Sequence, residues 1–383
     1  MINKKLKVGN VPNLRFPEFT EEWKTKKLGE VATNVMYGMN AAATNYDGEN
    51  QYIRITDIDE QTRLFCPNPL SSPDGELDNK YLLHKGDILF ARTGASVGKS
   101  YLYNEKDGKI YFAGFLIRLN VGDEDPYFIF SQTLTEKYQR WVLTMSMRSG
   151  QPGINAEEYK LLPIFIPSIQ EQDKISSFLL LIDERIQTQN KIIEELKLLK
   201  NTLRYQLYEQ ILNQENELIQ IKDVLNYEQP TKYLVTSADY SSDSTLNPVL
   251  TANKTFILGY TDEFFGVYDK GECIIFDDFT MDVKFVKFPF KVKSSAIKIL
   301  TAKPNVNLRF IFEYLSFLNL SSNEHKRHYI SEIESMKIFL PHSHNQNQMA
   351  NTLSIMDEKI KMESEIQRLL VKQKQYLLAN LFL

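Results

Sequence analysis

Residues 92–100, "RTGASVGKS", directly follow an apolar run and could belong to a loop that cradles nucleotide phosphates. Such a loop has two glycines with four residues between them, followed by Lys and Ser or Thr, so that backbone N–H groups surround the phosphate. Here Gly94 and Gly98 have only three residues between them, before Lys99 and Ser100. Because a shorter loop does not wrap the same phosphate, we interpret the segment as a glycine turn between two strands.

Two acidic strings offer the Asp-x-Lys pattern of metal-dependent nucleases: "PDGELDNK" at 73–80 and "DDFTMDVK" at 277–284. The first is expected to be a loop rather than a strand, because it contains a strong turn signal. Short acidic strings are also common in a chain with 49 acidic residues. A self-contained metal-dependent nuclease or NTPase therefore remains the alternative function.

The other residues capable of chemistry form no recognisable set. His325/His328 and His342/His344 have no carboxylate or Cys partner at metal-ligand spacing, so we expect surface histidines. The string "NPVL" at 247–250 lacks the second proline and the aromatic residue of an adenine methyltransferase motif. We therefore predict no catalytic residue, no metal site and no cofactor on this chain.

Composition indicates an ordinary soluble protein of two or three domains, with 383 residues, 43% of them apolar and 25% charged. No apolar run approaches the length of a membrane span, and Cys66 and Cys273 form no CxxC pair, which together predict a cytoplasmic protein without membrane contact. The formal net charge of -4 provides no general attraction to nucleic acid. A DNA site must therefore come from local patches.

An internal repeat organises the chain. A shift of 174 positions aligns 164–208 with 338–382, with 13 of 45 positions identical. Weaker similarities upstream relate "KKLGEVATNV" to "IQIKDVLNYE", and "KGDILF" to "KGECIIF". The repeat predicts two units, each a variable globular part followed by a retained tail.

Both tails have apolar residues at alternate steps of four and three, the pattern of a coiled-coil seam. Ser168 and Glu171 form a Ser-x-x-Glu capping box at the start of the first helix. The string "FLLLID" belongs to this seam, so Asp183 is expected to be a helix-surface carboxylate rather than a magnesium ligand. The predicted seam residues, for helix–helix or partner contacts, are Ile175, Leu179, Ile182, Ile186, Ile193, Leu196, Leu203, Leu207, Leu353, Met356, Ile360, Leu370, Leu377 and Leu381.

The repeat and the seam predict an α+β fold with a pseudo-twofold axis. Two globular domains of mixed strands and helices are separated by two long antiparallel coiled-coil helices, whose register is set by polar seam positions at Lys200, Lys374, Gln189 and Glu363. In the alternative, each helix folds back on its own globular part. The expected boundaries are 1–167 and 214–341 for the domains, and 168–213 and 342–383 for the helices.

The basic residues of both halves are the remaining candidates for function, and they could bind DNA. The segment 284–303 has six Lys and no acidic residue, and Lys and Arg also recur between residues 80 and 118. Such side chains neutralise phosphates, and Arg, Asn and Gln read base edges, although a solvated strand face has the same composition. The candidate DNA-binding residues are Tyr37, Asn40, Arg54, Arg92, Thr93, Ser96, Lys99, Arg148, Gln151, Lys232, Lys254, Lys284, Lys287 and Lys291.

Three segments together with the duplicated helix resemble the specificity subunit of type I restriction-modification enzymes. They are "VPNLRFPEFTEEWKTKKLGEVA" at 11–32, "LFARTGASVGKS" at 89–100 and "GQPGINAEEYKLLPIFIPSIQEQDKI" at 150–175. The resemblance implies two target-recognition domains, each reading one half of a bipartite, asymmetric double-stranded DNA site, with the helices as a ruler for the gap.

The resemblance also implies partners that carry the chemistry. Two methyltransferase subunits that bind S-adenosylmethionine would dock on the helices, and restriction subunits that use ATP and Mg²⁺ would join the complex. The second half departs from the pattern, because it lacks an "RTGASVG" counterpart. A coiled-coil scaffold with no DNA role is the third interpretation.

Overall fold

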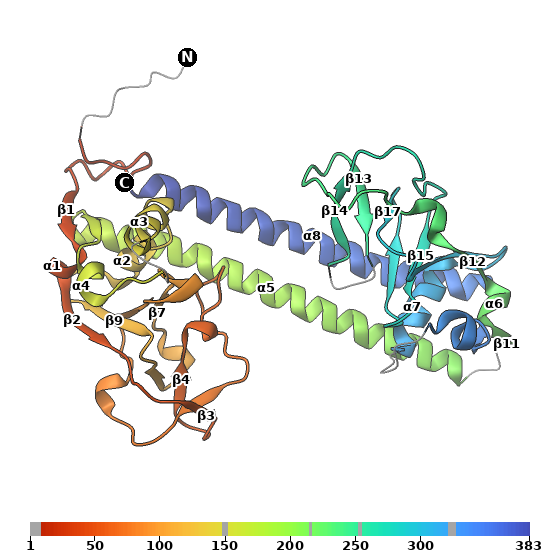
Figure 1. The fold of residues 1–383 in the computed structure, drawn as a ribbon, viewed down its shortest axis with the longest axis horizontal. Coiled ribbons are helices and arrows are strands. Elements are labelled where there is room, and N and C mark those ends of the chain that lie inside the picture. The colour runs from red at the N-terminus through yellow and green to blue at the C-terminus, as the bar shows by residue number, and fades with distance from the viewer. Residues whose placement is uncertain (1–8, 148–151, 214–216, 252–254, 321–326) are drawn as a thin grey trace, which may run out of the picture. The chain divides into compact units, whose positions relative to one another are not determined.

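The computed structural model describes residues 9–147, 152–213, 217–251, 255–320 and 327–383 (Figure 1). The chain divides into two compact units. The first comprises Met1–Thr188 with Ile366–Leu383, and the second comprises Gln189–Glu365. No helix in the described ranges is long and apolar enough to cross a membrane.

The first unit is built on a four-stranded antiparallel sheet whose order is β2-β9-β6-β7. Its centre is apolar because the strand "DILFA" is buried along its whole length, and helices α2 and α3 contribute further apolar residues to the same core. Two smaller pairs, β3 with β5 and the parallel pair β4 with β8, extend the domain (Figure 1). The bounds are β2 Ala32–Tyr37, β3 Ala43–Asn45, β4 Gln51–Ile53, β5 Ser71–Pro73, β6 Asp87–Ala91, β7 Ser100–Leu102, β8 Ile110–Phe112, β9 Leu116–Val121, α2 Pro126–Gln132 and α3 Glu136–Ser146.

The second unit repeats this plan. Its four-stranded antiparallel sheet has the order β12-β18-β15-β16, and β13 pairs in parallel with β17, as β4 pairs with β8. The related strings found in the sequence occupy equivalent elements, since "KGDILF" and "KGECIIF" lead into β6 and β15. The bounds are β12 Leu225–Glu228, β13 Asn247–Leu250, β14 Ile257–Thr261, β15 Cys273–Asp277, β16 Val283–Val286, β17 Lys291–Val292, β18 Ile297–Ala302 and α7 Leu308–Leu318.

In both units a short antiparallel strand pair leads into the long helix. The first pair is β1 (Lys24–Lys27) with β10 (Pro163–Ile166), and the second is β11 (Glu217–Gln220) with β19 (Lys337–Leu340). The single turns α1 (Leu28–Val31) and α6 (Ile221–Val224) follow β1 and β11 directly. The internal repeat therefore extends from the tails to the whole fold.

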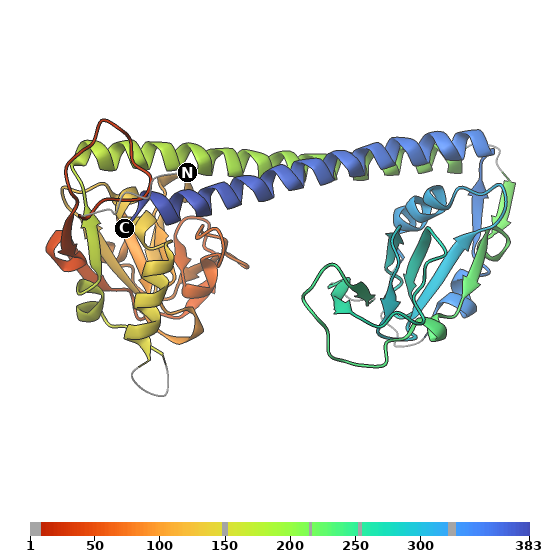
Figure 2. The same ribbon diagram turned by 90° about the horizontal axis from the view of Figure 1, so that it is seen from above.

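The long helices are α5 (Ile169–Leu212) and α8 (Ser343–Leu381), drawn in Figures 1 and 2. In the first unit the start of α5 lies against the end of α8, and in the second unit the end of α5 lies against the start of α8, so the helices run antiparallel. All fourteen predicted seam residues are buried or half-buried, whereas Leu181 and Leu198 on the outer faces are exposed.

The ends of the seam also belong to the domain cores. Ile175, Leu179 and Leu381 are part of the first core, and Leu353 is part of the second. The alternative, in which each helix folds back on its own globular part, is therefore wrong, because α5 and α8 pack on each other in both units. "FLLLID" lies within α5, as predicted.

The start of α5 differs in detail from the predicted capping box. The Glu171 N–H donates to Ser168 Oγ at 3.4 Å, which is the expected half of the motif. The Glu171 carboxylate, however, accepts two hydrogen bonds from Arg15, both at 2.7 Å. A cation from the N-terminal segment has taken the role that a backbone N–H has in a complete box.

Candidate nucleic-acid interface

The segment "RTGASVGKS" is a turn between two antiparallel strands, β6 and β7, with one 3₁₀ turn at Gly94–Ser96. Gly94 and Gly98 have φ angles of +74° and +86°, which glycine adopts at low cost. A Cβ atom at Gly98 would also lie 2.6 Å from Val142 Cγ1. A phosphate loop leads from a strand into a helix, so the predicted glycine turn is confirmed and nucleotide binding is not supported.

Lys99 is buried, which corrects its prediction as a DNA contact. Its ammonium group donates to the Ile58 carbonyl at 3.0 Å and pairs with the Glu60 carboxylate at 2.7 Å. A buried charge needs such partners, and these hold the group inside the domain. Lys99 therefore fastens the turn to the segment after β4 and is not available to a phosphate.

Arg92 lies at the end of β6, between two aromatic rings. Its guanidinium carbon is 5.0 Å from the centroid of the Tyr37 ring and 5.8 Å from that of Phe115. The two rings remain largely accessible, with exposed fractions of 41% for Tyr37 and 60% for Phe115. Phe115 was not a candidate from the sequence, because its contact with Arg92 depends on the pairing of β6 with β9.

The other candidates in the first domain differ in availability. Arg54 donates from Nε and Nη2 to the Asp57 carboxylate, both at 2.8 Å, so two of its donor groups are already used. Asn40 is exposed, whereas Thr93 and Ser96 are half-buried in the turn after β6. Arg148 and Gln151 lie outside the described residues.

The Lys-rich segment of the second domain is not the free positive patch that its composition predicts. Lys291 is fully buried; its ammonium group donates to the Phe265 carbonyl at 2.7 Å and pairs with Glu263 at 2.6 Å. Lys284 and Lys287 are more exposed and pair with Asp282 and Glu272. Lys291 is therefore wrong as a DNA contact.

Lys232 and Lys254 are the remaining candidate DNA-binding residues of the second domain. Lys232 is exposed on a 3₁₀ turn at Pro230–Tyr233, whereas Lys254 lies outside the described residues. The neighbouring Lys298 is buried and pairs with Asp278 at 3.2 Å, so it adds no free charge to the surface. Two of the six lysines of 284–303, Lys291 and Lys298, thus have their charge inside the protein.

The residue directly after the central strand of each domain, here called the strand-end residue, is Arg92 in the first domain and Asp278 in the second. The Arg92 carbonyl accepts from the Ile154 N–H at 2.9 Å, and the Asp278 carbonyl accepts from the His328 N–H at 3.0 Å. Ile154 and His328 are separated by the repeat distance of 174 residues. The two domains therefore place opposite charges at equivalent positions.

Asp278 borders a surface cavity. Its carboxylate is buried, accepts from the N–H groups of His328 and Tyr329, and pairs with Lys298. Tyr227 and Gln229 from the β12 end and Arg327 from the opposite side also line the cavity. The chemistry offered at this position is thus a set of fixed polar groups, rather than one cation between two rings.

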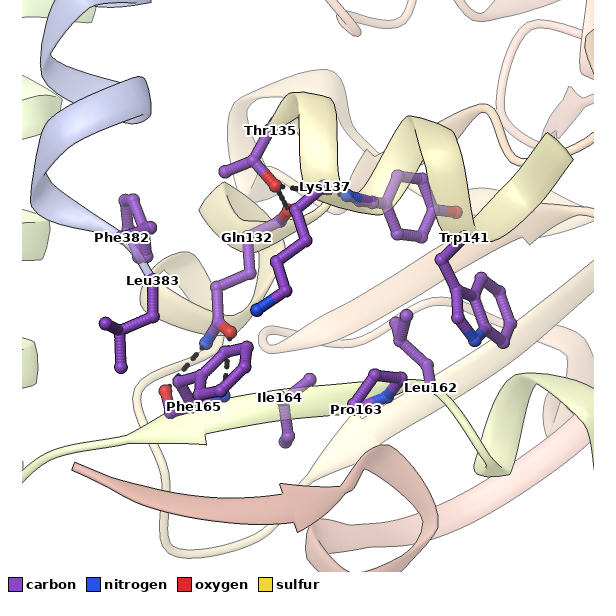
Figure 3. Close-up of a pocket in the computed structure, with 11 residues that line it drawn as sticks. Gln132, Thr135, Lys137, Trp141, Leu162, Pro163, Ile164, Phe165, Phe382 and Leu383 are labelled. Atoms are coloured by element: carbon purple, nitrogen blue, oxygen red, sulfur yellow. Dashed lines mark hydrogen bonds between the residues drawn. The ribbon is translucent and has the colours of Figure 1, made fainter. Parts of the chain in front are cut away.

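A second cavity of about 150 Å³ lies in the first unit between α3, β10 and the end of α8 (Figure 3). Gln132 clasps the Phe165 backbone, donating to its carbonyl at 3.1 Å and accepting from its N–H at 2.9 Å. The Lys137 ammonium group sits 3.9 Å from the centroid of the Phe165 ring, and burial lowers its pKa. The cavity marks where the domain docks on the helix pair.

The residues considered for metal chemistry form local pairs. Asp78 pairs with Lys80 at 2.7 Å, and Asp282 pairs with Lys284 at 2.8 Å. Within the described ranges, no group of three or more His, Cys, Asp or Glu side chains is placed to hold a metal ion. The predicted surface position of His328 is wrong, because this residue is buried beside Glu332, and His325 lies outside the described residues.

Comparison with known protein families identifies the family of this duplicated fold. Residues 20–198 and 213–371 each match the type I restriction modification DNA specificity domain. The chain belongs to this family. The two matched ranges agree with the two structural repeats, so the resemblance seen in the sequence is confirmed.

Individual relatives agree with this membership. The specificity subunit of the type I restriction enzyme EcoR124I/EcoR124II from Escherichia coli is 39% identical over 173 residues, which cover 42% of this chain and 43% of that protein. The chain thus matches less than half the length of this relative. A putative type I restriction enzyme MjaX specificity subunit from Methanocaldococcus jannaschii is 24% identical, with 99% of this chain and 95% of that protein covered.

Solved structures show the same fold. The S subunit of a type I restriction-modification system from M. genitalium matches with a TM-score of 0.63 at 15% identity, over 97% of this chain and 99% of that one. A chain from a structural study of complex assembly and conformational transition of the type I R-M system matches with a TM-score of 0.55 at 14% identity, over 94% and 97%. The predicted α+β architecture with an internal repeat is confirmed.

Proposed function

We propose that this chain is the DNA-recognition subunit of a type I restriction-modification complex, in which each domain reads one half of a bipartite, asymmetric site. The observation that carries the proposal is the difference between the strand-end residues, Arg92 and Asp278, on two copies of one fold. Because the two domains share a backbone but have opposite charges at this position, they suit half-sites of different base sequence. Exposed aromatic rings beside Arg92 supply a contact surface for bases in the first domain.

The chain acts with partners that supply the catalysis. Two methyltransferase subunits dock on the helix pair and carry S-adenosylmethionine, and restriction subunits that use ATP and Mg²⁺ complete the complex. In this proposal the chain itself is not an enzyme and works in the cytoplasm. Membership of the specificity family supports the assembly with other subunits.

The helix pair serves as the ruler for the gap between half-sites. Helix α5 has 44 residues, a length of roughly 66 Å at about 1.5 Å per residue. A seven-residue insertion in both helices, close to Gln189 and Glu363, keeps the heptad phase and lengthens the pair by about 10 Å. This corresponds to roughly three base pairs of duplex at about 3.4 Å each.

Co-expression with a methyltransferase subunit of such a complex tests the function. Single-molecule sequencing of methylated adenines should reveal a two-part motif, and the insertion variant should show the same bases with a gap longer by about three base pairs. A motif without two parts would overturn the proposal. If the purified chain alone cut DNA, hydrolysed ATP or transferred a methyl group, the self-contained enzyme would replace it.

A further inference from the structure

The Arg92 backbone is held on both sides. Its N–H donates to the Phe115 carbonyl at 3.1 Å, and its carbonyl accepts from the Ile154 N–H at 2.9 Å. Arg92 directly follows β6, which pairs with strands on both of its edges. A side chain carried on such a position starts from a defined point, because no flexible loop precedes it.

The side chain itself is also oriented. Cation–π contacts with Tyr37 and Phe115 limit where the guanidinium group can lie, and the Tyr37 ring is itself held in place because its hydroxyl accepts from the Ala156 N–H at 3.1 Å. An arginine held in this way loses little conformational entropy when it binds a planar partner.

Arg92 lacks the acidic partner that several other cations of this domain have. Arg54, Lys99 and Arg118 pair with Asp57, Glu60 and Asp87. The Arg92 guanidinium, by contrast, has no carboxylate within 4.0 Å and no side-chain hydrogen bond to any described residue. Its Nε is buried without a partner, so the two Nη groups are the donors that remain for a ligand.

We propose that Arg92 is a specificity-determining residue that reads a guanine in the half-site of the first domain. This inference rests on the proposed DNA-recognition function. A guanidinium fork matches the two acceptors, O6 and N7, on the major-groove edge of guanine. A phosphate matches the same fork, but the exposed Tyr37 and Phe115 rings beside the guanidinium group offer apolar surface that suits base edges rather than phosphates.

At the matching position the second domain has a carboxylate instead of a cation. Asp278 at the matching position is buried and already pairs with Lys298. Altering Arg92 should therefore affect only the half-site of the first domain. Phe115, exposed beside the guanidinium group, is a positioning residue in this account.

The test uses the full chain co-expressed with the methyltransferase subunit, and compares methylated motifs for the wild type, Arg92→Lys, Arg92→Gln and Phe115→Ala. Arg92→Lys keeps the charge but removes the planar fork, so discrimination at one base position should fall by about 5- to 150-fold. Arg92→Gln should shift that position towards adenine, which Gln reads through N6 and N7. The second half-site and the gap should not change.

Lys85→Ala serves as a matched control, because it removes an exposed cation from the turn before β6 and should leave the motif unchanged. If both Arg92 variants kept the wild-type motif and methylated every site more slowly, Arg92 would be a phosphate contact and the inference would be wrong. A loss of base discrimination in both half-sites would also overturn the inference. A wild-type complex without a two-part motif would instead reject the proposed function itself. Phe115→Ala, which changes only an exposed ring, provides the same readout if an Arg92 variant does not fold.

Discussion

Lys200 of α5 pairs with Asp357 of α8 at 2.7 Å in the second unit, and the same interaction recurs in the first unit between Lys374 and Asp183 at 2.5 Å. Each Lys is 174 residues from its counterpart, and so is each Asp. The repeated pair thus joins one helix to the other twice, with the roles of the helices exchanged. The apolar seam supplies most of the packing, and these pairs specify which register the helices adopt.

Exchanging the charges of Lys374 and Asp183 should show whether this pair sets the register of the helices. Lys374→Asp or Asp183→Lys alone places like charges together, whereas the double variant restores an attractive pair. Both side chains are partly exposed, so we expect a coupling free energy of only about 0.5–1 kcal/mol. Urea denaturation of the four proteins measures it, and additive single effects would show that the pair has no role in register.

The second unit contains a denser cluster around Glu313 of α7. This carboxylate is fully buried and accepts from Arg204 at 2.7 Å and from Arg309 at 2.5 Å, with Lys200 at 3.3 Å. Glu313→Gln should destabilise the second unit by about 3–5 kcal/mol, because Arg204 then loses its carboxylate partner while Lys200 and Arg309 share Asp357. Ser131 occupies the corresponding place on α2, six residues after the helix N-cap as Glu313 is, and Ser131→Ala should cost less than about 1 kcal/mol. Thermal unfolding compares the two variants, and equal losses would contradict the assigned charge balance.

Stability of the second domain should depend on the ionisation of Glu263. The hydrogen bond from Lys291 is the main cause that lowers the pKa of Glu263 from 4.5 to about 2. Because the folded-state pKa lies below the unfolded value, this stabilisation is present above about pH 4.5 and is lost as the pH falls towards 2. Melting temperatures measured between these pH values should show the loss.

Lys291→Met should reduce this acid sensitivity and cost about 3 kcal/mol at neutral pH, because Glu263 loses its charged partner and keeps only the hydrogen bonds from Thr236 and Ser237. Lys287 provides the control, since its side chain is 62% exposed and Lys287→Met should change stability by less than about 0.5 kcal/mol. An unchanged acid profile in the Lys291 variant would assign the sensitivity to other carboxylates.

Gln172 fastens the first domain to α5. Its side chain accepts from the Asp125 N–H at 3.0 Å and donates to the Pro167 carbonyl at 3.1 Å, and Gln346 makes the same two contacts in the second unit. Gln172→Met leaves the half-buried Asp125 N–H without this acceptor, so we expect a loss of about 1–2 kcal/mol. Gln170→Met, on the exposed side of the same turn, should be neutral.

Tryptophan fluorescence is a selective probe for this variant. The two Trp residues, Trp23 and Trp141, both belong to the first unit. The denaturation midpoint seen by fluorescence should shift for Gln172→Met and stay unchanged for Gln346→Met. A shift of similar size in both would mean that the two units unfold together.

The features that the sequence determined by itself depend on local conformation or on periodic spacing. The glycine turn after β6 follows from the backbone freedom of Gly94 and Gly98, and the seam from Ile175 onward follows from the apolar heptads of α5 and α8. The duplication is detectable because the tails are similar in sequence. It correctly predicts that the two domains share one fold, although their own sequences have diverged.

Only the tertiary structure decided which charged side chains are available for binding. The sequence predicts Lys99 and Lys291 as surface cations, but both are buried in the fold and pair with Glu60 and Glu263 from other segments. Arg92 gained its importance from Tyr37 and Phe115, which strand pairing brings beside it. Burial and ion pairing depend on partners distant along the chain, and composition alone does not contain that information.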